Sequence, residues 1–150
     1  MNGASESISE FFATDHDEID ALLAAVPFGA PQEALPLLRE FDRRLERHIR
    51  WEEEILFPTA AEAAPFLGGG PIPVMLAEHE AVRGAKAAAV KALERGDAAA
   101  ARRAVSTLTA CLTPHNDKEE GILYPACDEA LSPVEAEVLL NRIRAAASQG

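Results

Sequence analysis

Apolar residues recur at every third or fourth position along most of this chain, with polar residues between them. This spacing is typical of amphipathic helices, and no segment reads convincingly as a strand. We therefore expect an all-α protein, an up-down-up-down four-helix bundle with a short extra C-terminal helix. The expected helices cover about residues 5–25, 31–58, 75–96, 98–127 and 133–148.

Prolines, glycines and capping residues predict where these helices begin and end. Pro27 and Gly29 follow the first apolar stripe, and Pro58 marks the weakening or end of the second helix. Residues 65–73, with three glycines and three prolines, form the most irregular stretch and predict a loop between two similar halves. Residues 132–135 (Ser-Pro-Val-Glu) form a capping box, which predicts that the last helix starts there and packs outside the bundle.

Polar residues interrupt the apolar stripes at positions meant for the core. The stripe of the second helix is Leu38, Phe41, Leu45, His48, Glu52 and Ile55, and that of the fourth is Val105, Leu108, Leu112, His115, Glu119 and Ile122. The first and third helices each carry one histidine on the same kind of stripe, His16 and His79. These four histidines are all that the chain contains, so every histidine falls on a face expected to be buried.

The same residues repeat in the two halves of the chain. The segment 48–58 (HIRWEEEILFP) is matched by 115–125 (HNDKEEGILYP), so that both the histidine and the glutamate recur 67 positions later. His79 follows His16 by 63 positions. This pattern indicates an internal duplication in which two helical hairpins face each other, with the six polar side chains directed inward.

Histidine and glutamate four residues apart project from one face of a helix, so each pair offers a nitrogen and an oxygen ligand to one point. A buried, unpaired carboxylate costs several kcal/mol, which a cation would offset. Six ligands suffice for two metal ions, and a mixed nitrogen and oxygen set suits iron or manganese. Iron is favoured over manganese, and zinc is disfavoured because it prefers four ligands. The alternative is a metal-free bundle in which the histidines are ordinary hydrogen-bonded residues.

Several neighbours of these residues have ordinary interpretations. Acidic residues beside the six, namely Glu53, Glu54, Glu78, Glu80 and Glu120, are expected on solvated faces. Cys111 is expected to fill the core rather than to act as a redox thiol. Trp51 and Tyr124 suit either pocket lining or a hydrogen bond to a ligand residue, or else simple packing. Pro114 either aims His115 or makes a surface kink.

Composition limits the class of protein. A chain of 150 residues, 48% of them hydrophobic, predicts one domain over residues 1–150. A formal net charge of −11 argues against nucleic acid or an anionic membrane as partner. Two cysteines fit a reducing compartment, and without a leader or membrane-spanning run the expected location is the cytoplasm. The oligomeric state stays open.

The pattern of a single histidine, His-x-x-x-Glu, a further histidine and a second His-x-x-x-Glu resembles the hemerythrin-like, or HHE cation-binding, family over about residues 8–127. The resemblance implies a four-helix bundle holding a non-haem di-iron centre with an oxo or hydroxo bridge. It further implies that the four histidines are terminal iron ligands and that Glu52 and Glu119 bridge the two irons.

One departure from the oxygen-carrying hemerythrins affects the expected function. Those proteins have five histidine ligands, two of them one turn apart on the third helix, whereas here Met75 and Arg83 flank His79. Four-histidine members are associated with nitric oxide, peroxide, iron and redox or oxygen sensing. We therefore expect a protein that binds O2, NO or peroxide in oxygen, redox or iron sensing or handling. The alternative is a di-iron redox enzyme that removes peroxide, reduces oxygen or supports iron-sulfur repair; whether the protein is an enzyme stays open.

Overall fold

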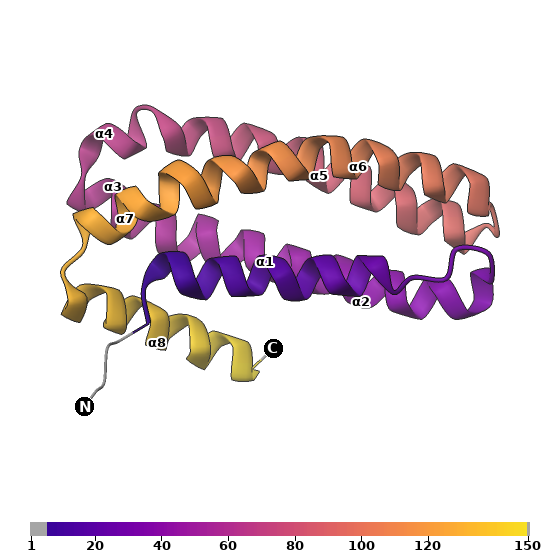
Figure 1. Ribbon diagram of the computed structural model, residues 1–150, viewed down its shortest axis with the longest axis horizontal. Coiled ribbons are helices and arrows are strands. Elements are labelled where there is room, and N and C mark those ends of the chain that lie inside the picture. The colour runs from indigo at the N-terminus through magenta and orange to yellow at the C-terminus, as the bar shows by residue number, and fades with distance from the viewer. Residues whose placement is uncertain (1–5, 150) are drawn as a thin grey trace.

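The computed structural model describes residues 6–149, and within them the chain is helical with no strand (Figure 1). The long helices of the bundle are α1 (Ile8–Ala24), α2 (Pro31–Trp51), α5 (Pro71–Glu94) and α6 (Ala98–Lys118). They run along the long axis of the molecule, α1 and α2 on one side and α5 and α6 on the other, while α8 (Pro133–Gln149) lies outside them (Figure 1). The expected all-α bundle with an extra C-terminal helix is confirmed. That residues 1–150 form one domain stays a prediction.

Two of the bundle helices, α2 and α6, continue into a short segment with a wider helical turn. α2 continues as the π-helix η1 (Glu52–Leu56) and then α3 (Phe57–Ala63), and α6 continues as η2 (Glu119–Leu123) and α7 (Tyr124–Ala130). In each π segment a backbone N–H bonds to the carbonyl five residues earlier, that of Glu52 or Glu119. Short π segments of this kind occur frequently at functional sites.

Of the two outcomes expected at Pro58, weakening or end of the second helix, the end does not occur, because the helix runs on through this proline to Ala63. A proline inside a regular α-helix clashes with the carbonyl four residues earlier. The wider π turn stands directly before Pro58, and an equivalent turn stands before Pro125. We attribute the continuation of both helices to this local widening, which relieves the clash.

The π turns also correct two expected core positions. Ile122 was expected on the buried stripe but is 61% exposed, and Ile55 is only half-buried. The buried residues are instead Leu56 and Phe57 in one half and Leu123 and Tyr124 in the other. In a π turn each hydrogen bond spans five residues. The next residues on the same side of the helix as the glutamate therefore lie four or five positions after it, not three.

The irregular stretch between the halves is largely helical, which corrects the expected loop over residues 65–73. It contains the short helix α4 (Pro65–Gly68) and the start of α5 at Pro71. The first helical position tolerates proline because its N–H would have no partner within the helix. Pro65 and Pro71 occupy that position in α4 and α5, so these prolines begin helices here instead of breaking them.

Capping residues fix the other helix ends much as the sequence predicts. Asp97 caps α6 by accepting a hydrogen bond from the N–H of Ala100, and Ser132 and Glu135 form the expected capping box. The first helix begins at Ile8 because Ser7 and Glu10 form a second capping box. The expected start near Ser5 lies outside the described residues.

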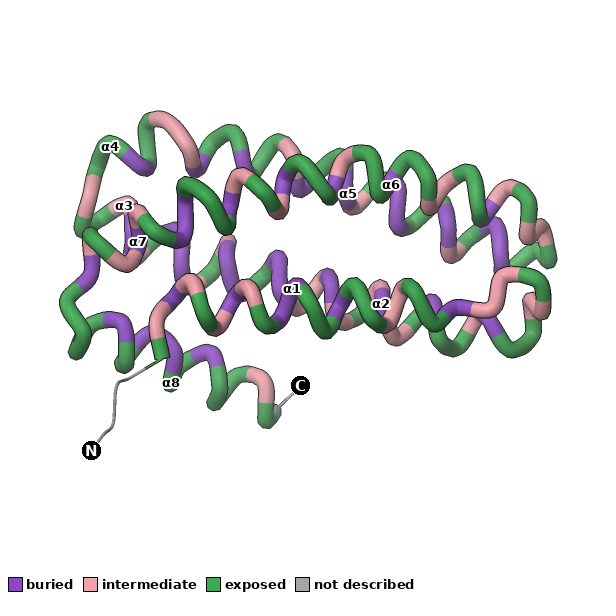
Figure 2. Tube along the Cα trace, in the orientation of Figure 1, coloured by how far each residue is buried: buried purple, intermediate pink, exposed green. Residues whose placement is uncertain are grey.

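Buried side chains form two apolar clusters along the bundle, and Figure 2 shows the buried positions on the facing sides of the helices. The first lies where α3, α7 and α8 meet, and includes Phe12, Leu56, Leu123, Tyr124 and Leu139. The second lies toward the α5–α6 connection, and includes Ile19, Phe41, Leu45, Val82 and Leu108. Each long helix carries a buried histidine between these clusters, whereas the buried Lys86 lies among residues of the second cluster.

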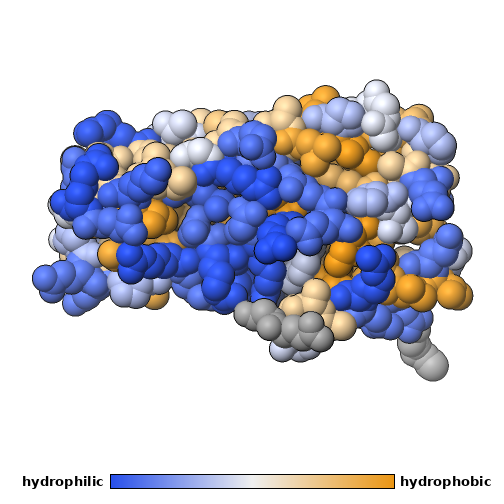
Figure 3. All heavy atoms as spheres, turned by 180° about the vertical axis from the view of Figure 1, so that it is seen from behind, coloured by the Kyte–Doolittle hydropathy of each residue, from blue (hydrophilic) through white to orange (hydrophobic). Residues whose placement is uncertain are grey.

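Hydrophilic and hydrophobic side chains are unevenly distributed over the surface of this acidic chain. On the face seen in Figure 3, hydrophilic side chains cover the middle, and the larger hydrophobic areas lie toward the end of the molecule that carries α4. Among the described residues, no helix is both long and apolar enough to cross a membrane.

Candidate metal centre

The six polar residues of the apolar stripes come from four helices and two π segments and meet between the two apolar clusters. His16 lies on α1, His48 on α2, His79 on α5 and His115 on α6, while Glu52 and Glu119 are the first residues of η1 and η2. Each is at most 3% exposed. The structure therefore brings together every residue that the sequence nominated as a ligand.

Ligand atoms of these residues form two overlapping groups, in each of which all atoms lie within 4.8 Å of one another. One group contains Glu52, His79, His115 and Glu119, and the other contains His16, His48 and Glu119. Histidines of one half face the glutamate of the other half: Nε2 of His79 lies 3.1 Å from Oε1 of Glu52, and Nε2 of His16 lies 3.1 Å from Oε1 of Glu119. The duplicated sequence thus gives a nearly two-fold symmetric site.

A carboxylate contacts the outer nitrogen, Nδ1, of every histidine. The pairs are His16 with Glu120 at 2.7 Å, His48 with Asp15 at 2.8 Å, His79 with Glu53 at 2.8 Å, and His115 with Glu78 at 2.9 Å. Because a carboxylate only accepts, Nδ1 donates in each pair, and Nε2 is the nitrogen presented to the centre. Carboxylates hold metal-binding imidazoles in this orientation in many metal sites.

Cations hold three of these four carboxylates in turn. Nη2 of Arg44 lies 3.2 Å from Asp15, Nη2 of Arg83 lies 2.9 Å from Glu53, and Lys118 pairs with Glu78. Glu120 forms no ion pair with a lysine or arginine among the described residues, and its side chain is 43% exposed. One of the four imidazoles is therefore held by a carboxylate that is open to solvent.

The charges of the cluster shift its ionisation strongly. Burial alone would lower the pKa of His48, but Glu52, Asp15 and Glu119 together raise it to about 10. Burial likewise opposes ionisation of His115, yet Glu119 and Glu78 raise its pKa to about 9. In the absence of metal these imidazoles therefore carry protons that neutralise the carboxylates, and a metal ion would displace the protons on Nε2.

Burial raises the pKa of Glu52, but hydrogen bonding to Glu119 and the charges of His48 outweigh it and leave the pKa well below its ordinary value. Oε2 of Glu119 is also buried and has no hydrogen-bond partner, although Nε2 of His115 lies 3.2 Å away. The charge of the His115 ring offsets part of the cost of burying this carboxylate oxygen, and a cation bound directly to the oxygen would offset it further. The residues present therefore fit a metal.

The sequence profile described as the hemerythrin HHE cation binding domain matches residues 7–127, which include all six residues of the cluster. The chain belongs to this family. No curated protein and no solved structure matches the chain. A family that binds cations and a buried His/Glu cluster together indicate a metal cofactor; the six individual ligands stay predictions.

Tyr124 places a further polar group inside this hemerythrin-like cluster. Its hydroxyl oxygen lies 2.6 Å from Oε2 of Glu52 and 2.9 Å from Oε1 of Glu119, and the residue is fully buried. Burial and the two carboxylates raise its pKa well above the ordinary value, so the phenol is neutral. Of the two roles open to Tyr124 on sequence alone, the structure shows the polar one.

Cys111, Pro114 and Arg83 lie away from the cluster's centre. Cys111 is half-buried against the second apolar cluster, and Pro114 lies exposed within a continuous α6. Arg83 binds Glu46, Glu53 and Glu80, so its contact with the site runs through the carboxylate on His79. Both cysteines are free thiols.

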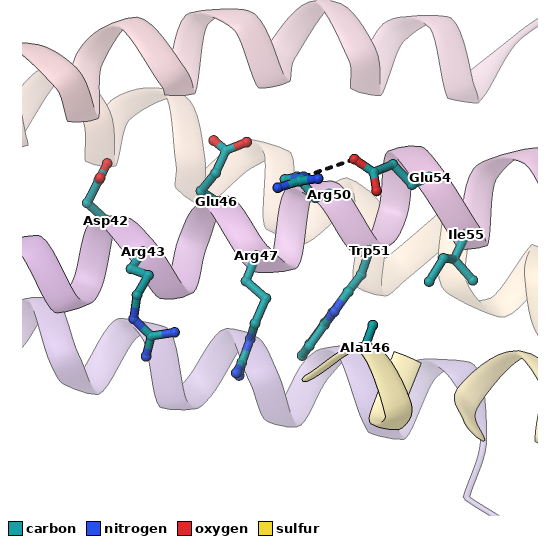
Figure 4. A pocket seen from close by; sticks show the side chains of 9 residues that line it. All are labelled: Asp42, Arg43, Glu46, Arg47, Arg50, Trp51, Glu54, Ile55 and Ala146. Atoms are coloured by element: carbon teal, nitrogen blue, oxygen red, sulfur yellow. Dashed lines mark hydrogen bonds and ion pairs between the residues drawn. The ribbon is translucent and has the colours of Figure 1, made fainter. Parts of the chain in front are cut away.

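A cavity of about 520 Å³ lies on the outer face of α2, and none of the six predicted ligands lines it. In Figure 4, Arg43, Arg47 and Trp51 extend on one side of α2, with Ala146 of α8 next to the indole. The guanidinium of Arg47 stacks over Trp51 at 4.6 Å from the ring centroid. Packing therefore accounts for Trp51 in this structure.

Sequence reasoning missed the carboxylates on Nδ1, which were expected in solvent or, for Asp15, not considered. A regular signal was present: an acidic residue precedes each single histidine and follows each glutamate of a pair, giving Asp15, Glu53, Glu78 and Glu120. Glu54 and Glu80, in contrast, are exposed and pair with arginines as solvated residues do. Helix register alone could not reveal the contacts, since they are made between different helices.

Proposed function

We propose that this protein holds two non-haem iron ions at His16, His48, Glu52, His79, His115 and Glu119. The observation that carries the proposal is the meeting of four imidazole Nε2 atoms and two fully buried carboxylates, one with an oxygen that accepts no hydrogen bond. When bound, an iron pair supplies one-electron redox steps and coordination positions open to a small ligand. Iron is preferred over manganese and zinc because of the mixed nitrogen and oxygen donors.

The physiological ligand that we propose is O2, NO or peroxide, with a role in oxygen, redox or iron sensing or handling. The site has only four histidines, because Met75 and Arg83 stand where a fifth would lie one turn from His79. Arg83 is committed to three glutamates, so it leaves this position without a ligand from the protein. Fewer protein ligands leave more room for an external one.

The protein's own residues would orient and isolate this reaction. The four carboxylates on Nδ1 fix the imidazoles, and the two apolar clusters exclude water from both ends of the site. We place the protein in the cytoplasm, away from nucleic acid and anionic membranes, on the strength of its free thiols and its net charge of −11.

A second function, a di-iron redox enzyme that consumes peroxide or oxygen, is favoured by one observation. The neutral Tyr124 hydroxyl lies at the centre of the site, where a proton donor for such a reaction would be needed. Repair of iron-sulfur centres belongs to the same class.

The experiment that separates these functions uses iron-loaded protein, reduced without oxygen and then exposed in turn to NO, O2 and hydrogen peroxide. A spectral change that is complete with one equivalent of NO or O2 per site, and that reverses when the gas is removed, supports ligand binding. Loss of many equivalents of peroxide per site supports the enzyme. The control is the double variant Glu52→Ala/Glu119→Ala, which should not respond, and an unresponsive iron-loaded wild type would contradict both functions.

A further inference from the structure

The duplication that builds the metal centre is broken at one position. Phe57 and Tyr124 stand 67 residues apart, each five positions after the glutamate that opens its π segment. Both are buried, and both pack on a histidine of the opposite half: Phe57 stacks on His79 at 5.8 Å between ring centroids, and Tyr124 lies 5.7 Å from the ring of His16. The two rings are therefore structural counterparts that differ by one hydroxyl group.

The hydroxyl of Tyr124 lies on the side of the metal site formed by His16 and His48. Its oxygen is 3.3 Å from Nε2 of His16 and 3.2 Å from Nε2 of His48, in addition to its two contacts with Glu52 and Glu119. The half formed by His79 and His115 has an apolar ring in the same place. One phenol carries one proton, so it can serve only one of these acceptors at a time.

We propose that Tyr124 makes the two metal positions unequal, by donating a hydrogen bond to a small anion bound on the His16/His48 side. This inference rests on the metal centre proposed above. A cation would engage the carboxylate oxygens that face the hydroxyl here, which leaves the phenol proton for an external ligand. The Phe57 side offers such a ligand no donor, so the anion binds where it gains a hydrogen bond.

Azide, a small anion with a strong infrared absorption, is the probe for this proposal. Four di-ferric proteins are compared: wild type, Tyr124→Phe, Phe57→Tyr, and the swap Phe57→Tyr/Tyr124→Phe. Tyr124→Phe should bind azide about 10- to 100-fold more weakly, because a hydrogen bond to a charged group is lost. The swap should recover most of the affinity, since the repeat places the new hydroxyl at the equivalent point of the other half.

The infrared spectrum tests the hydrogen bond itself. In D2O the azide stretch should shift in the wild type, lose that shift in Tyr124→Phe, and regain it in the swap. Equal affinities and equal isotope shifts in wild type and Tyr124→Phe would overturn the proposal. A tyrosinate-to-iron charge-transfer band that disappears in Tyr124→Phe would also overturn it, because the tyrosine would then be a ligand and not a neutral donor.

Metal content, measured on all four proteins, separates this inference from the proposed function. If the wild type holds no metal or binds no azide, the proposed function fails. If the wild type binds azide and Tyr124→Phe loses its metal, Tyr124 serves to hold the site together and the donor role is overturned. If Tyr124→Phe keeps two metal ions and loses only azide affinity and the isotope shift, the donor role is supported.

Discussion

At the scale of single residues, the carboxylates that contact Nδ1 determine which nitrogen of each imidazole, Nε2, is available to a metal. Three of them are held by cations, while Glu120 on His16 is partly exposed. Each histidine is thus oriented by its own carboxylate, and the carboxylate on His16 is the one not held by a lysine or arginine among the described residues. The contribution of each carboxylate to metal affinity should therefore be measurable separately.

Replacing Glu53 by glutamine should weaken metal binding by about 10- to 100-fold, because the carboxylate that orients His79 loses its charge. Glu54 provides the matched control, since it is adjacent in sequence, exposed, and paired with Arg50. Competition with a chelator measures both affinities. Equal affinities in Glu53→Gln and Glu54→Gln would show that the contact with Nδ1 contributes nothing.

The six cluster residues could be predicted from sequence because they replace apolar residues on otherwise regular stripes. The supporting carboxylates could not, because an acidic residue beside a ligand has the same pattern as a solvated one. Glu53 and Glu54 show the difficulty: they are neighbours of the same type, and only the fold distinguishes them. The role of Tyr124 was likewise open until its hydroxyl could be placed between two carboxylates.

At the scale of helices, the π segments place the ligands and rotate the residues beyond them. Each starts at a glutamate of the cluster and turns the next residues by one position, so that Tyr124 and not Ile122 enters the core. Helical periodicity assumes a constant turn, and it therefore predicted the long helices well and the buried face beyond Glu52 and Glu119 poorly. Pro58 and Pro125 were visible signs of irregularity, but their effect was a wider turn and not a helix end.

Another link between helices should control stability without touching the site. Asp128 on α7 accepts hydrogen bonds from the N–H groups of Ile8 and Ser9 and from the hydroxyl of Ser9, and so caps α1 from outside. Replacing Asp128 by alanine should lower the free energy of unfolding by about 1–3 kcal/mol, because these donors lose their partner.

Urea unfolding of the metal-loaded protein measures this loss. The control is Ser7→Ala, which removes the exposed local cap of the same helix and should cost about 0.5–2 kcal/mol. Metal content should stay the same in both variants. An unchanged midpoint in Asp128→Ala would mean that the contact with α1 does not stabilise the bundle.

At the scale of the whole molecule, a charged layer divides the core into two apolar clusters. The overall bundle could be predicted because the apolar stripes, caps and duplicated halves agree with one another. The helical stretch at residues 65–73 could not, because its prolines and glycines are equally typical of a loop. Because charged residues are buried in this layer, the free energy of unfolding should depend on their protonation.

The metal-free protein should lose stability as the pH rises from about 6.5 to about 10. The pKa of His48 is raised to about 10 and that of His115 to about 9 in the folded state, from an ordinary 6.5. A raised folded pKa gives stability that is complete below the unfolded pKa and disappears as pH passes the folded one. Thermal unfolding at several pH values measures this, and the metal-loaded protein, whose cations replace the protons, should show less of the fall. A metal-free protein that is more stable at pH 9 than at pH 6 would contradict this linkage.

Metal content per chain decides whether the six cluster residues form a di-iron centre. Protein purified without added metal, and again after reconstitution with ferrous iron, is analysed by mass spectrometry beside Glu52→Ala, Glu119→Ala and the control Glu54→Ala. We predict about two irons per chain in the wild type and the control, and loss of metal with lower stability in the two cluster variants. A wild type without metal after reconstitution, or cluster variants with undiminished metal, would contradict the proposed centre.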